Sequence, residues 1–94
     1  MRSIIPGDYK NICHYCERFF EKTHKHHIFG GPNRKWSEKY GLYVHLCPEH
    51  HNMSNHSVHH DKAIMDAYHQ LGQKCFEVEH SHDEFMRIFG RNYL

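Results

Sequence analysis

The chain has 94 residues, which is enough for one small domain and too few for two. Its 12 Lys and Arg residues nearly balance 11 Asp and Glu residues, so the net charge of +1 neither requires nor excludes a nucleic-acid partner. No run approaches the roughly 18 apolar residues of a membrane span, so we expect a soluble, cytoplasmic protein without a membrane partner.

Histidine and cysteine are the informative residue types. The 13 histidines are several times the share found in an average protein, which suggests metal ligation or imidazole acid/base chemistry. A folded chain of this length buries only about 60–65% of the surface that its unfolded form exposes, so a stabilising disulfide or metal ion is expected. In a reducing compartment, the four cysteines favour metal thiolates over disulfides.

The first half of the chain is rich in turns and short strands. Residues 1–12 form a lead-in, and a glycine turn follows at residues 30–33. An amphipathic stretch then leads to a strand-like run at residues 42–46, which we expect to pair in a β-hairpin with the segment before the glycine turn. Pro48 suits the first position of a helix, which is expected to be short because residues 52–58 are poor helix formers.

The second half is predicted to be helical. Apolar residues recur at helical spacing through residues 60–79, which predicts an amphipathic helix with Cys75 on its packed face. Ser81 and Glu84 form a capping box that opens a shorter helix, and Gly90 ends it.

Two ligand pairs predict a zinc site. Cys13 and Cys16 form a Cys-x-x-Cys pair, and Cys47 and His50 form a second pair with the same spacing. Two such pairs complete a tetrahedron around one ion, which makes the site structural. The alternatives are buried cysteines with incidental spacing and a redox Cys-x-x-Cys, although the latter requires a thioredoxin-like βαβ pattern.

A second set of histidines predicts a hydrolytic site. His26 and His27 precede the glycine turn, and His51 directly follows the second zinc pair. A hairpin packed on a helix would bring these imidazoles together, with one divalent ion beside one free base, as phosphodiester hydrolysis requires. The alternative is that they are hydrogen-bonded polar residues or accessory zinc ligands. We assign no specific role to several other histidines, His24 among them.

The motifs CHYC, HHIFGG and LCPEHHN resemble those of the HNH, or ββα-metal (His-Me finger), endonucleases, particularly small phage-type members braced by zinc. The resemblance covers residues 13–60. It implies an α+β fold in one domain, residues 1–94, with a small zinc-braced ββα-metal finger over about 13–60 and C-terminal helices over about 61–94.

The resemblance also implies roles for individual histidines. It makes His27 the general base and His26 and His51 ligands of a catalytic Mg²⁺ or Mn²⁺ ion. The third ligand is expected about a turn or two beyond His51. His59 is the favoured candidate, on the same helical face if the helix is unbroken; if it breaks, His59 or His60 would be a loop ligand.

One family residue is absent from its usual place, a few positions before the cysteine of the second zinc pair. Gly41 and Leu42 stand where the family has its middle asparagine, and Asn33 and Asn52 are the candidates to replace it.

The basic segment Asn33, Arg34 and Lys35 adjoins the expected active site. These residues are predicted to contact DNA through its phosphates, with Trp36 nearby either stacking on a base or packing in the core.

Two functions follow as hypotheses. The first is a metal-dependent DNA endonuclease with a phage or prophage role in DNA processing. The second is a zinc-braced module without catalysis that binds DNA or a host protein, for example as a phage inhibitor. The missing asparagine favours the second hypothesis, and the complete set of His26, His27 and His51 favours the first.

Overall fold

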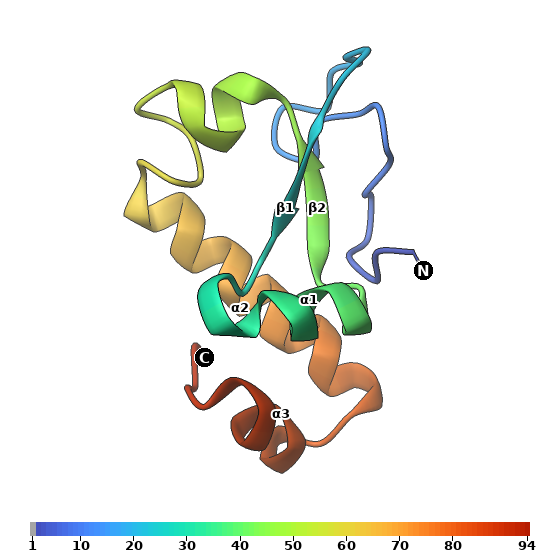
Figure 1. Ribbon diagram of the computed structural model, residues 1–94, viewed down its shortest axis with the longest axis vertical. Coiled ribbons are helices and arrows are strands. Elements are labelled where there is room, and N and C mark those ends of the chain that lie inside the picture. The colour runs from blue at the N-terminus through green and yellow to red at the C-terminus, as the bar shows by residue number, and fades with distance from the viewer. Residues whose placement is uncertain (1) are drawn as a thin grey trace.

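The computed structural model describes residues 2–94 as a two-stranded antiparallel sheet surrounded by helices (Figure 1). The elements, in chain order, are β1 (His24–His27), a 3-10 turn η1 (Gly31–Asn33), α1 (Arg34–Tyr40), β2 (Tyr43–Leu46), a π-helical turn η2 (Glu49–Met53), α2 (Lys62–Glu79) and α3 (His82–Phe89). The expected α+β class is therefore confirmed, whereas membership of the ββα-metal fold stays a prediction. Within residues 2–94, no helix is both long and apolar enough to cross a membrane.

The hairpin sorts its side chains onto two faces. β1 runs antiparallel to β2, with His26 opposite Val44 and His27 opposite Tyr43. Because successive side chains of a strand point to opposite faces, His24 and His26 share one face and Lys25 and His27 share the other. The strands are joined through η1 and α1, and α1 ends at Gly41, whose φ of 71° suits a residue without a Cβ.

The core lies below the hairpin, between its end and the two C-terminal helices. Ile28 and Phe29 follow β1 and are almost fully buried against Phe76 of α2 and Phe85 of α3. α2 approaches this layer closely at Gly72, where a Cβ would lie 2.9 Å from the Ile28 side chain. The contacts with α2 and α3 thereby hold the end of β1 in place.

Both predicted C-terminal helices are confirmed. Asp61 caps α2 by accepting hydrogen bonds from the backbone N–H groups of Ala63 and Ile64. Ser81 caps α3 by accepting from Glu84 N, and Gly90 ends that helix at a φ of 75°.

The N-terminal lead-in packs on the outer edge of the hairpin, on the side away from η2 (Figure 1). Ile4 N donates to Gly41 O at 2.8 Å, and His14 N donates to His45 O at 2.8 Å. Asp8 accepts from both the backbone N–H and the ring of His45, at 2.6 and 2.8 Å. These bonds fix the Cys13–Cys16 turn against β2.

Candidate metal centres

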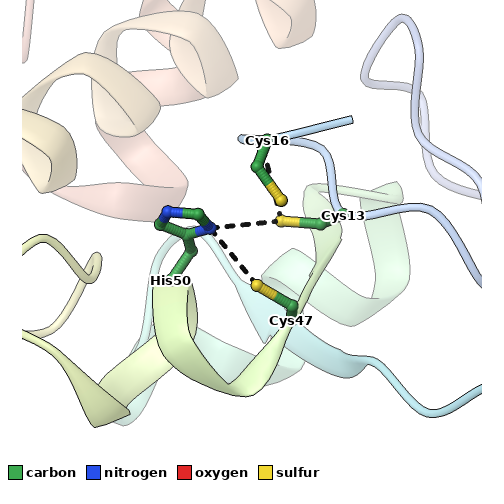
Figure 2. A group of neighbouring side chains, drawn as sticks. All are labelled: Cys13, Cys16, Cys47 and His50. Atoms are coloured by element: carbon green, nitrogen blue, oxygen red, sulfur yellow. Dashed lines mark hydrogen bonds between the residues drawn. The ribbon is translucent and has the colours of Figure 1, made fainter. Parts of the chain in front are cut away.

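Cys13, Cys16, Cys47 and His50 converge on one point, and their ligand atoms all lie within 4.8 Å of one another (Figure 2). His50 Nδ1 lies 3.2 Å from Cys47 Sγ and 3.8 Å from Cys13 Sγ. A tetrahedral site with bonds of about 2.0–2.3 Å has edges of roughly 3.5–3.8 Å, so these separations are close to those around a bound ion. The group, which we call the first centre, can hold a metal ion.

The local backbone makes the first turn tight. Glu17 N donates to Cys13 O at 2.7 Å, and Cys13 N donates to Arg18 O at 3.0 Å. The turn requires Glu17 to adopt a φ of 62°, in the left-handed region that favours glycine. The second pair is formed where β2 ends at Leu46 and η2 begins, so that Cys47 and His50 face the same point.

The thiols of the first centre differ in acidity. Burial opposes ionisation of Cys16, but hydrogen bonds from the Arg18 backbone and side chain, and from Cys13 and His50, outweigh it and lower the pKa of Cys16 to about 6. Burial raises the pKa of Cys47 to about 11. The Cys16 thiol therefore ionises more readily than the buried Cys47 thiol, whose ionisation a bound cation would favour.

His26, His51 and His59 form a second group whose ligand atoms lie within 4.8 Å of one another. The Nε2 atoms of His51 and His59 are 3.1 Å apart. His26 comes from β1 and is 6% exposed, whereas His59 is exposed. Since η2 ends at Met53, His59 reaches the group from a loop, as expected for a broken helix. We call this group the second centre.

Two imidazoles of the second centre, those of His26 and His51, are held in the neutral form that can bind a cation. Burial, reinforced by the neighbouring imidazoles, lowers the pKa of His26 to about 3 and that of His51 to about 4. Both rings are therefore neutral at physiological pH, with a lone pair available on one nitrogen.

His24 is a member of this neighbourhood that the sequence analysis missed. Its Nδ1 lies 2.9 Å from Nδ1 of His51, and the rings meet edge to face with centroids 5.0 Å apart. This contact leaves Nε2 of His51 pointing toward His59. The two-residue period of β1 was the available signal, because it places His24 on the same face as His26.

His27, the predicted base, lies on the other face of β1 from His26. Its Nε2 is 2.7 Å from Oε1 of Glu38, and Arg34 Nε donates to its Nδ1 at 3.3 Å. The side chain of His27 is only 8% exposed. Glu38 was not anticipated, because it belongs to α1 and its contact with β1 depends on how that helix packs.

The family's middle asparagine either orients the base histidine or bridges the loop through backbone hydrogen bonds, and neither candidate to replace it orients His27. Asn33 donates to Phe89 O at 3.4 Å, and the Asn52 carbonyl accepts from His60 Nε2 at 2.9 Å. In the described part of the chain, neither forms a hydrogen bond with His27. Glu38 is the residue that orients this imidazole.

The predicted DNA-contact residues line two hollows that His27 also borders. Arg34 and Lys35 line an open hollow with His27. A smaller hollow of about 300 Å³ is lined by Asn33 together with His26, His27 and His59. This smaller hollow is therefore next to both His27 and the second centre.

The structure thus brings both predicted ligand sets together, whereas His27 lies on the other face of β1 and meets the second centre only through the hollow that it lines with His26 and His59. Comparison of the chain with protein-family models, curated proteins and solved structures gave no match. The function must therefore be argued from the motifs and from the geometry of this chain.

Proposed function

We propose that the protein is a metal-dependent endonuclease that hydrolyses DNA phosphodiester bonds. The observation that carries the proposal is the convergence of His26, His51 and His59 next to His27, around a hollow that all but His51 line. Phosphodiester hydrolysis needs a group that polarises the phosphate and a base that accepts a proton from water. This neighbourhood contains residues suited to both tasks.

The second centre fits Mn²⁺ better than Mg²⁺. Mg²⁺ prefers oxygen ligands in an octahedral shell, whereas imidazole nitrogens suit Zn²⁺, Cu²⁺, Ni²⁺ and Fe²⁺ best and bind Mn²⁺ more weakly than these. When bound, the ion supplies Lewis-acid polarisation of the phosphate and stabilises the negative charge that develops on it. His26 and His51 would hold the ion from the protein interior, and His59 from the solvent side.

His27 is proposed as the base, with Glu38 as its positioning residue. A hydrogen bond from His27 Nε2 to the Glu38 carboxylate fixes the tautomer that leaves a lone pair on Nδ1. A bound phosphate would compete for Arg34 and free that nitrogen. Nδ1 would then take a proton from water as the water oxygen bonds to phosphorus, and the leaving oxygen would depart and be protonated by solvent.

The first centre is proposed to bind zinc as a structural ion. Three cysteines and one histidine are a donor set typical of closed, four-coordinate zinc sites. Cys47 and His50 flank the start of η2, which carries His51, so an ion there would also fix the position of a second-centre ligand.

Plasmid cleavage tests the endonuclease proposal. Supercoiled DNA is incubated with purified, zinc-loaded protein in Mn²⁺, in Mg²⁺ or without an added divalent ion, beside His27→Ala and a control variant, His82→Ala, on the exposed face of α3. We expect nicking that requires a metal ion, is faster in Mn²⁺ and falls by about 10²–10⁴-fold in His27→Ala alone. Nicking that is independent of metal, or equal in the two variants, contradicts the proposal.

A binding module without catalysis is the second candidate, favoured by one observation. Both ring nitrogens of His27 already have partners, Glu38 and Arg34. DNA binding without cleavage in any of the metal ions would support this second function over the first.

A further inference from the structure

The hairpin face opposite the second centre forms the floor of a groove. The strand register places Lys25, His27, Tyr43 and His45 on this face. At one end, a hollow of about 730 Å³ separates Lys25 from the N-terminal lead-in. At the other end, His27 borders the hollow lined by α1. We call the two hollows and the face between them the hairpin groove.

The hairpin groove gathers positive charge. The residues that line its two hollows include five cations, namely Arg2, Lys10, Lys25, Arg34 and Lys35. They include two carboxylates, and both are engaged: Asp8 with His45 at 2.8 Å, and Glu38 with His27 at 2.7 Å and with Lys25 at 3.4 Å. The groove therefore carries a surplus of three positive charges, whereas the whole chain carries +1.

Exposed aromatic rings lie at the N-terminal end of the groove. Tyr9 is 65% exposed and lines the larger hollow, and Phe19 is 68% exposed. Both residues are bridged to Ile12, in antiparallel pairs, so the three side chains share one side of this small loop. Aromatic rings beside a cationic groove suit stacking on unpaired bases.

We propose that the hairpin groove binds single-stranded DNA, with Tyr9 stacking on a base and Arg2, Lys10 and Lys25 neutralising successive phosphates. The strand continues past His27 to Arg34 and Lys35. This proposal rests on the proposed function for its choice of DNA as partner. Stacking on Tyr9 requires a base that is free of its complement, so an unpaired strand fits the groove better than a duplex.

Fluorescence anisotropy in buffer without added divalent metal ions tests the groove without requiring cleavage and leaves the first centre intact. The probe is a labelled oligodeoxythymidylate of about 15 nucleotides, and a duplex of the same length is the competitor. The charge variant is Arg2→Gln with Lys10→Gln. Its matched control, Lys74→Gln with Arg87→Gln, removes two exposed cations from α2 and α3. Circular dichroism and zinc content confirm that each variant is folded.

The charge variant should bind the single strand about tenfold more weakly than the control, and the slope of log K against log salt should fall by about 1.4. Tyr9→Ala should lose about fivefold or more with an unchanged salt slope. Equal affinities of the charge variant and its control overturn the groove, as does a preference for duplex that Tyr9→Ala leaves intact.

The two proposals fail in different ways. Binding that follows these expectations, together with no cleavage in any metal ion, supports the groove and overturns only the endonuclease. The other outcome is metal-dependent cleavage of DNA with a charge variant that binds and cuts as well as the control. That outcome supports the endonuclease and overturns only the groove.

Discussion

The first and second centres both use a histidine of η2, but they differ in the type, number and exposure of their ligand residues. The first centre has three cysteines and one histidine, and two of the cysteines, Cys13 and Cys47, are almost fully buried. The second has three imidazoles, one of them exposed, and borders a hollow. A closed tetrahedral set suits a structural ion, and an open three-ligand set suits an ion that must contact substrate. The number and exposure of the ligand residues therefore suit the first centre to stabilising the fold and the second centre to contacting a substrate.

Adjacent residues connect the two centres. His50 belongs to the first centre and His51 to the second, and η2 turns their rings in different directions. The backbone bond from His51 N to Cys47 O, at 2.9 Å, links the second centre to a ligand of the first. Substitutions at these neighbouring positions should consequently have different effects.

The largest effect is expected from His50→Ala. Structural zinc binding contributes on the order of 10 kcal/mol to folding in small domains, and loss of one ligand leaves three thiols in a poorly formed site. The variant should be unfolded at room temperature, as measured by circular dichroism and amide NMR dispersion. The wild-type protein should unfold in the same way when a strong chelator removes its zinc, and a folded, zinc-free protein would contradict the assignment.

His51→Ala should instead leave a folded protein that still holds about one zinc ion. The second centre would lose one of its three ligands, so nicking in Mn²⁺ should fall by at least about 100-fold. Plasmid cleavage, zinc analysis and a thermal melt measure the three properties on one sample. An unfolded His51→Ala variant would show that the centres are not separate in function.

A smaller effect is expected at His24, which would act on a bound ion only through His51. Metal binding at His51 Nε2 requires a proton on Nδ1, and His24 Nδ1 lies at 2.9 Å to accept that hydrogen bond. His24→Val should weaken Co²⁺ binding at the second centre by about 10–100-fold, followed by visible absorption. His24→Gln keeps an acceptor and should retain more affinity. Equal weakening in both variants would argue for a packing role.

Ligand identity was predictable from the sequence because spacing is local information. Cys13 and Cys16 must lie in one turn, and Cys47 and His50 must face one direction at the start of the helical turn after β2. The grouping of these four residues could therefore be predicted from their spacing alone. The helical turn after Pro48 and the start of α3 at Ser81 followed from local signals, whereas α1 (Arg34–Tyr40) was described only as an amphipathic stretch. His59 was reached by the same reasoning, once a broken helix was allowed.

Other contacts between elements were not predictable. Glu38 meets His27 only because α1 lies across the end of β1, and no spacing in the chain encodes that angle. His24 was passed over because one histidine among 13 carries little information without its partner. The hairpin groove depends on where the lead-in packs, which follows from hydrogen bonds such as Ile4 N to Gly41 O.

The smallest effect is expected at Glu17, where the first centre carries a conformational cost that the second does not. A non-glycine residue at a φ of 62° is disfavoured by about 1–2 kcal/mol. Glycine removes this strain, but it also raises the conformational entropy of the unfolded chain, which cancels part of the gain in stability. Glu17→Gly should therefore raise the free energy of unfolding by about 0.5–1 kcal/mol and Tm by a few degrees. Glu17→Ala keeps the strained backbone and removes the same charge, so it should show no such gain. If both substitutions raise Tm equally, the cost lies in the Glu17 side chain and not in the turn that forms the first centre.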